Sequence, residues 1–77
     1  MDIKEFIENF AGQFENFDSS RLKPETRFKD LDEWSSLVAL SVIAMVDDEY
    51  DVTIGGGDIR NSDTVEDLFN IVRSKAE

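Results

Sequence analysis

The stretch DEWSSLVAL, residues 32–40, decides the fold because a polar segment becomes an apolar run within it. Two adjacent serines, Ser35 and Ser36, stand at that junction. The apolar run continues as SLVALSVIAMVDDEY over residues 36–50, which is too long for a typical strand. We therefore predict a helix that begins at Ser36 and ends near Tyr50.

This predicted helix is apolar on nearly every side before its acidic end. Such a helix is either fully buried or uses one face for partners, and 77 residues cannot readily surround a whole helix. We therefore expect an exposed partner face, formed by Leu37, Val38, Ser41, Ala44 and Met45, with Asp48 at its edge. Leu40, Ile43 and Val46 are expected to face the core.

The segments on either side predict further helices and no strands. Apolar residues recur at helical spacing from Ile3 to Phe17 and again from Thr64 to Lys75. N-terminal caps are expected from two pairs, Asp2 with Glu5 and Asp63 with Glu66. The three glycines at 55–57 predict a flexible turn, and residues 58–61 predict one short helical turn that buries Ile59.

Residues 18–34 lack sustained periodicity and contain Pro24, so we expect a long first loop pinned by Leu22, Phe28 and Leu31. The sequence thus predicts one all-α domain over residues 1–77, a small four-helix bundle with three main helices and a short third helix. The expected core consists of Phe6, Phe10, Phe14, Phe28, Leu40, Ile43, Val46, Ile54, Ile59, Val65, Leu68 and Val72.

The composition excludes several classes of function. The net charge of −10 disfavours nucleic acids and anionic membranes and favours partners with basic surfaces. The chain has no cysteine, which excludes disulfides, a thiolate nucleophile and most structural zinc sites. No apolar stretch approaches the ~20 residues that span a bilayer, and MDIKEF does not resemble a signal peptide. We expect a cytoplasmic monomer.

Three kinds of functional site are also excluded, because residues that each of them requires are missing. A serine hydrolase needs a base, and the chain has no histidine and no motif around its lysines. The glycines at 55–57 are not followed by the Lys-Ser/Thr of a phosphate-binding loop. An EF-hand loop that started at Asp47 would have Val52 where glycine is required and Asp58 where glutamate is required. We expect no catalytic residues and no metal site.

The serine pair is suited to an anion at the start of the helix. Ser35 is placed to be the N-cap, which puts Ser36 at the first helical position, directed outward. A phosphate attached to Ser36 would be stabilised by free backbone N–H groups and by the helix dipole. Simple capping by both serines explains the same pattern equally well, so local physics leaves the two interpretations open.

The segment FKDLDEWSSLVALSVIAMVDDEYDVTI, residues 28–54, resembles the acyl carrier protein family, and the similarity extends over nearly the whole chain. That family is a small acidic four-helix bundle with a long first loop, and its Asp-Ser-Leu motif opens the second helix. The matching features here are Phe28, the pair Asp30-Leu31, the pair Ser36-Leu37 and the acidic-aromatic DDEYDVTI. Trp34 matches the tryptophan found just before the motif in some related carriers.

The resemblance implies a phosphopantetheine arm, taken from coenzyme A, on Ser36. A phosphopantetheinyl transferase would attach the arm, and its thiol would hold acyl groups as thioesters for fatty acid or related biosynthesis. The chain itself would not be an enzyme. Its partners would be the transferase and acyl-transferring or chain-elongating enzymes with basic docking surfaces. The expected partner-binding residues are Ser35, Leu37, Val38, Ser41, Met45, Asp47, Asp48 and Glu49.

Two departures from the family pattern stand out. Ser35 replaces the usual aspartate, which keeps a cap but removes a charge beside the attachment point. The first turns of the helix also lack the family's acidic residues. Long acyl chains could shelter between the helices near the small residues Ala39 and Ala44. Three alternatives stay open: a specialised aminoacyl, peptidyl or polyketide-type carrier, an unmodified acidic protein-interaction domain, and an acidic metal-binding module.

Overall fold

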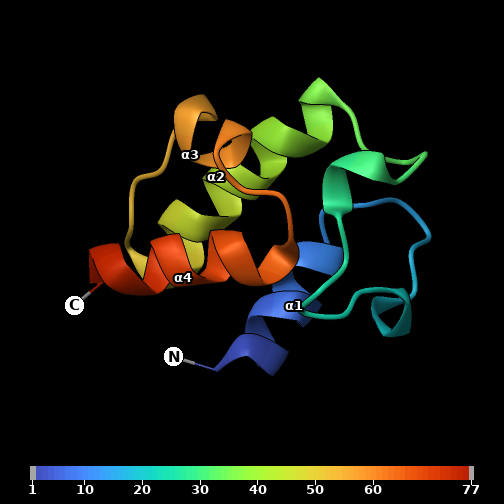
Figure 1. The fold of residues 1–77 in the computed structure, drawn as a ribbon, viewed down its shortest axis with the longest axis horizontal. Coiled ribbons are helices and arrows are strands. Elements are labelled where there is room, and N and C mark those ends of the chain that lie inside the picture. The colour runs from blue at the N-terminus through green and yellow to red at the C-terminus, as the bar shows by residue number, and fades with distance from the viewer. Residues whose placement is uncertain (1, 77) are drawn as a thin grey trace.

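The computed structural model describes residues 2–76 as an all-α bundle, and no strand occurs within that range. Figure 1 shows three longer helices with a short one between the second and the last, and a long connection looping out at one end. This architecture confirms the predicted fold class. The elements are α1 (Ile3–Ala11), the 3-10 turns η1 (Ser19–Arg21) and η2 (Phe28–Asp30), α2 (Ser36–Tyr50), α3 (Gly56–Arg60) and α4 (Val65–Ala76).

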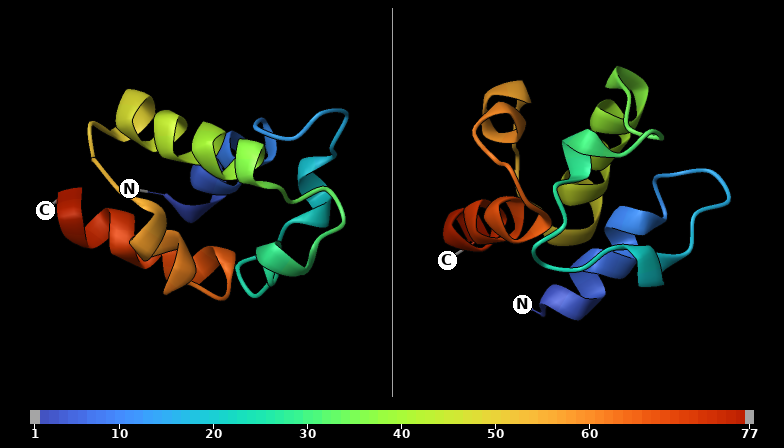
Figure 2. Two further views of the ribbon diagram at one scale, coloured as in Figure 1. Left: turned by 90° about the horizontal axis from the view of Figure 1, so that it is seen from above. Right: turned by 45° about the vertical axis from the view of Figure 1, so that its right-hand side comes forward.

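Most of the core residues come from α1, α2 and α4, whose arrangement Figure 2 shows, and α3 and the loops contribute the rest. Phe6 stands at the centre of the core, with its ring 5.5 Å from that of Phe69 on α4 and 5.8 Å from that of Tyr50 on α2. Most of the expected core residues are buried, and so is Phe69, which shares their helical spacing on α4. The core also contains Ala11, Val42, Met45 and Val52, which we did not predict. None of the helices within residues 2–76 has the length and apolar character needed to cross a bilayer.

The first helix is shorter than predicted, because α1 ends at Ala11 and residues 12–16 form turns. Gly12 follows the helix directly, and Asn16 takes a left-handed conformation (φ 53°) that ends any helical continuation. Phe14 and Phe17 nevertheless remain at the core and stack on each other at 4.5 Å, since the turns keep both rings on the same side.

The predicted N-terminal cap of α1 is confirmed, and that of α4 is wrong. Asp2 caps α1 as expected, with its carboxylate accepting from the N–H of Lys4 at 3.0 Å. At α4 the predicted pair Asp63–Glu66 is wrong. Thr64 Oγ1 accepts from the N–H of Asp67, and the Asp67 carboxylate accepts from the N–H groups of Thr64 and Asp63. The hydroxyl and carboxylate thus form a capping box one residue later.

The helix α2 has the predicted bounds but a different rotation about its axis. Met45 was expected to face outward and is only 6% exposed, whereas Leu40 was expected in the core and is 63% exposed. Val42 and Val46 complete the buried stripe, and Ile43 is half-buried. A helix that is apolar on nearly all sides carries no clear phase in its sequence, so only its packing against α1 and the rest of the core sets which side is buried.

The short helix α3 begins at Gly56, two residues earlier than predicted, and buries Ile59 as expected. The Asp58 carboxylate accepts from the N–H of Gly55 at 3.1 Å and so closes its first turn. The hydroxyl of Ser62, a residue that is fully buried, donates to the Asp58 carbonyl at 2.9 Å. Local hydrogen bonds therefore hold this helix of five residues, although two of the five are glycines.

The long first loop has a packing role. The carbonyls of Pro24 and Thr26 accept from the N–H groups of Glu66 and Val65 at 2.9 and 3.1 Å, which satisfies the first turn of α4. Leu22 and Phe28 are buried and Leu31 is half-buried, so the predicted pins are present. The loop is thereby fixed to the bundle just before the serine junction.

Candidate functional site

The two serines of the junction have different roles in the structure. Ser35 is the N-cap of α2, and its Oγ accepts from the N–H of Val38 at 3.2 Å. The Ser35 carbonyl accepts from the N–H of Ala39 at 2.9 Å, the first hydrogen bond of the helix. Ser36 is the first helical residue and is exposed. The predicted division between a capping serine and an outward serine is confirmed.

The start of α2 leaves backbone donors available beside Ser36. Among the described residues, the N–H groups of Ser36 and Leu37 have no hydrogen-bond acceptor. No carboxylate lies in the first turn of the helix. These donors and the positive end of the helix dipole favour an anion next to the Ser36 hydroxyl.

Aromatic packing fixes the chain just before the serines. Trp34 is half-buried, and its indole lies edge-on to the Phe28 ring at 4.9 Å and parallel to the Phe10 ring at 6.2 Å. The backbone N–H of Trp34 donates to the Leu31 carbonyl at 3.0 Å. The residue before it, Glu33, pairs with Arg21 across the loop at 2.7 Å, and the hydrogen bond from Arg21 holds the pKa of the Glu33 carboxyl below its usual value. The N-terminus of α2 is therefore held from two sides.

An open groove of about 710 Å³ runs beside Ser36, between α2 and α3. Its walls are largely apolar, and its volume is in the range of small-molecule sites. Trp34, directly before the serines, lies in the lining. The residues that line it are Lys29, Trp34, Ser35, Ser36, Ala39, Leu40, Ile43, Gly56, Ile59 and Arg60.

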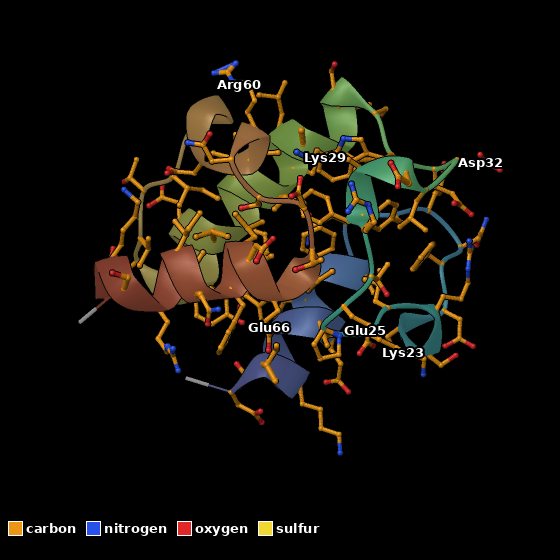
Figure 3. All side chains as sticks on the ribbon, viewed as in Figure 1. Lys23, Glu25, Lys29, Asp32, Arg60 and Glu66 are labelled. Carbon is orange, nitrogen blue, oxygen red and sulfur yellow. The ribbon has the colours of Figure 1, made fainter. Side chains whose placement is uncertain are left out.

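Of the residues that the structure describes, two cations and no carboxylate contribute to the lining of this groove. Lys29 reaches from η2 to the end of α3, where its ammonium donates to the carbonyls of Ile59 at 3.3 Å and Arg60 at 3.1 Å. The ammonium therefore caps the negative end of α3. Figure 3 shows Lys29 beside α2 and Arg60 on α3.

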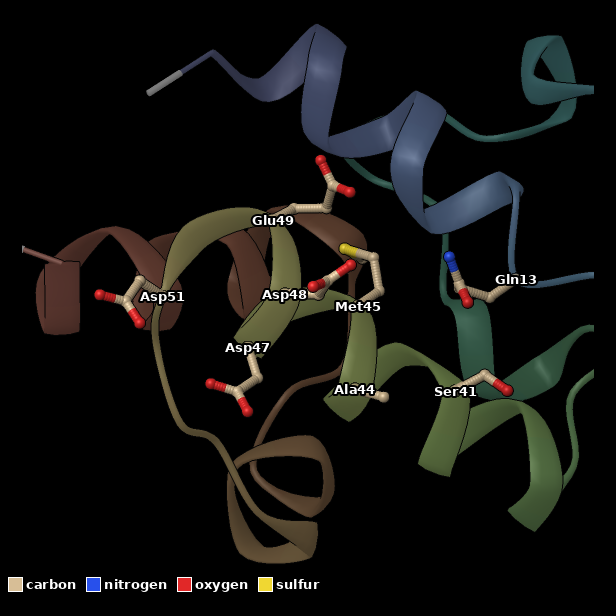
Figure 4. Close-up of a pocket in the computed structure, with 8 residues that line it drawn as sticks. All are labelled: Gln13, Ser41, Ala44, Met45, Asp47, Asp48, Glu49 and Asp51. Carbon is tan, nitrogen blue, oxygen red and sulfur yellow. The ribbon is translucent and has the colours of Figure 1, made fainter.

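The C-terminal half of α2 borders a second concavity of about 790 Å³ with the opposite charge. Figure 4 shows Gln13, from the turn after α1, opposite Ser41, and the carboxylates further along α2. No cation from residues 2–76 lies in its lining. The residues that line it are Gln13, Ser41, Ala44, Met45, Asp47, Asp48, Glu49 and Asp51. Within residues 2–76, no group of three acidic side chains is placed to hold a metal ion.

The structure separates the predicted partner residues into two groups. Ser35 and Leu37 are exposed at the serine end of α2, and Leu37 is the most exposed large apolar side chain among the described residues, at 74%. The other group lines the acidic concavity: Ser41, Met45, Asp47, Asp48 and Glu49. Met45 lies there as a buried side chain, and Val38 is half-buried against the core, so neither is an outward apolar contact.

The sequence missed three residues of the groove. Lys29, Arg60 and Gly56 belong to η2 and α3, and no local pattern connects them with Ser36. Leu40 was expected in the core and instead lines the groove as an exposed residue. Of the two small residues, Ala39 lines the groove, whereas Ala44 lines the acidic concavity. Only tertiary packing brings these positions together.

Comparison of the chain with models of protein families, with curated proteins and with solved structures found no match.

Proposed function

We propose that the protein is an acyl carrier in which Ser36 bears a phosphopantetheine arm. The observation that supports this proposal best is the position of Ser36. Its hydroxyl is exposed at the first residue of α2, next to two free backbone N–H groups, and it borders an apolar groove. The N–H groups suit the phosphate of an arm, and the groove suits the apolar group that an arm would carry.

The residues present fit the phosphate of this cofactor and the apolar group that it would carry. The phosphodiester would lie at the N–H groups of Ser36 and Leu37, since a phosphate on Oγ cannot leave that end of the helix. Ala39 and Ile43 give the adjoining groove an apolar wall on α2. When bound, the arm supplies a thiol that holds acyl groups as thioesters, a chemistry that the cysteine-free chain cannot provide itself.

Attachment of the arm would be the work of a separate transferase. The Ser36 oxygen attacks the pantetheine-side phosphorus of coenzyme A, and the bond between that phosphorus and the bridging oxygen breaks. Adenosine 3′,5′-bisphosphate leaves, and the serine proton passes to a base of the transferase. The proposal therefore needs no activating residue at the junction, and the chain has no histidine to supply one. In this proposal the protein is a cytoplasmic carrier for fatty acid or related biosynthesis and not an enzyme.

Partner enzymes would meet α2 at both of its ends. The carboxylates of Asp47, Asp48 and Glu49 are exposed beside the acidic concavity and favour a basic docking surface. At the other end Leu37 offers an apolar contact next to the attachment point. Asp48→Lys should lower the affinity of such a partner and reduce the salt dependence of its binding. The matched control is Asp63→Lys, the same charge change at an exposed position on the loop before α4.

Intact mass spectrometry tests the proposal. The protein is incubated with coenzyme A and a broad-specificity phosphopantetheinyl transferase, alongside Ser36→Ala and Ser35→Ala. We expect one arm on the native chain and on Ser35→Ala, and none on Ser36→Ala. No arm with any of several transferases contradicts the proposal and favours an unmodified acidic interaction domain, whose binding would use the acidic concavity without the groove.

A further inference from the structure

The two concavities along α2 have opposite charge, which the overall composition does not predict. The chain has 18 acidic and 8 basic residues, yet among residues 2–76 the groove beside Ser36 is lined by two cations and no carboxylate. The concavity at the other end of α2 is lined, within the described part of the chain, by four carboxylates and no cation. An excess of positive charge at one groove of a strongly acidic protein is an unusual local environment that favours an anion there.

The two cations are available to a ligand. Lys29 is half-buried, and two of the three N–H groups of its ammonium are used by the Ile59 and Arg60 carbonyls. These bonds fix the ammonium at the groove and leave one donor for another acceptor. Arg60 is exposed, and within residues 2–76 its guanidinium forms no ion pair. The nearest acidic residue in its helix, Asp58, is instead engaged by Gly55 and lies 3.9 Å from Lys75.

The position of the cations indicates which anion they would meet. The phosphate of an arm on Ser36 is tied to the α2 wall of the groove, where backbone N–H groups already serve it. Lys29 and Arg60 belong to η2 and α3, which form the opposite wall, and Ile43 and Ile59 form apolar surface in the same groove. A ligand that fills this groove therefore meets apolar side chains along its length and positive charge at α3.

We propose that the cargo of this carrier is an acyl chain that ends in a carboxylate, whose apolar part lies in the groove and whose carboxylate pairs with Lys29 and Arg60. This inference rests on the proposed carrier function and names its class of substrate. A neutral acyl chain would fill the apolar walls but leave both cations unpaired. A short charged cargo would not use the apolar walls.

The test is the pKa of the cargo's own carboxyl group. The chain is loaded from adipoyl-coenzyme A with the carboxyl carbon labelled with carbon-13, and this group is titrated by NMR. The reference is the same adipoyl group on free pantetheine. We expect the carboxyl pKa on the carrier to be lower by about one pH unit, because two cations favour its charged form. Arg60→Gln should reverse about half of that change, whereas Arg73→Gln, the same charge change on α4 away from the groove, should leave it intact.

A carboxyl pKa that is higher on the carrier than in the free thioester overturns the inference. If the carboxylate lay at the acidic concavity, the carboxylates there would raise its pKa above that of the free thioester, and if it extended into solvent its pKa would equal the free value. A pKa equal to or above the free value therefore excludes the contact with Lys29 and Arg60. If the cations served the phosphodiester instead, Arg60→Gln would move the phosphorus-31 signal of the arm and not the carboxyl pKa.

The only tryptophan gives an independent readout, because Trp34 lines the groove. Adipoyl cargo should change its fluorescence more than the neutral methyl ester of the same chain, and equal changes would contradict the inference. Failure of the loading step itself would instead contradict the carrier proposal, so the two failures are distinguishable.

Discussion

The rotation of α2 predicts that two residues of similar size respond very differently to truncation. Met45 is 6% exposed and belongs to the core cluster, so Met45→Ala should cost about 2–5 kcal/mol of unfolding free energy. Leu40 is 63% exposed, so only roughly a third of it is covered. Complete burial of a leucine is worth about 1.5–3 kcal/mol, and Leu40→Ala should therefore cost at most about 1 kcal/mol. The better helix propensity of alanine reduces that cost further.

The assay is urea unfolding followed by far-UV circular dichroism, with both variants and the native chain at the same pH and salt. A domain of this size is expected to have about 0.05–0.15 kcal/mol of stability per residue, so the loss at Met45 should be a large fraction of the total. Stability is compared through the transition midpoint, with the slope held common. A Leu40→Ala variant that loses as much stability as Met45→Ala would refute the rotation of α2 described here.

Three further predictions follow from hydrogen bonds and burial. Ser35→Ala should destabilise the protein by about 1 kcal/mol through loss of the cap on Val38, whereas Ser36→Ala should change stability by less than about 0.5 kcal/mol in the same urea assay; equal losses would contradict the assigned cap. The N–H groups of Thr64 and Asp63 lower the pKa of the Asp67 carboxyl below 3.8, so its stabilising effect is present above that pH and is lost as pH falls through its folded pKa. The difference in Tm between the native chain and Asp67→Asn should accordingly close on acidification, and a difference that does not depend on pH would contradict this account. Burial raises the pKa of Tyr50, the only tyrosine, above 10.0 and outweighs the hydrogen bond donated by Asn9, which lowers it. An absorbance titration should therefore give a midpoint above that of the urea-unfolded chain, and the associated stability should be lost as pH rises through the folded value. Coincident midpoints would contradict the burial of this hydroxyl.

The helices could be predicted from the sequence because each carries a local signal. Apolar spacing around Phe6 and Phe10 marks α1, and the polar-to-apolar change at Ser35 marks the start of α2. The cap at Ser35 was also predictable, since capping depends on residues within one turn. The end of α1 was not predictable from periodicity, because Phe14 and Phe17 continue the apolar pattern through turns that are not helical.

The candidate site was predictable only in part, for a different physical reason. Ser36 and its free N–H groups follow from local helix geometry and were identified from the sequence. The groove depends on which side of α2 faces α3, and an apolar helix such as this one does not encode that choice locally. Lys29 and Arg60 become neighbours of Ser36 only through the packing of η2 and α3 beside α2, so no motif could have indicated them.

The most direct test of the account is to locate the arm on the native chain. The protein is incubated with coenzyme A and a transferase and is then fragmented in the mass spectrometer. Cleavage between residues 35 and 36 gives one fragment that contains Ser35 and one that contains Ser36, so the added mass is assigned to one serine. The cap formed by Ser35 and the exposed first-turn position of Ser36 predict the whole added mass on Ser36. An arm on Ser35, or no arm on either serine, would contradict the account.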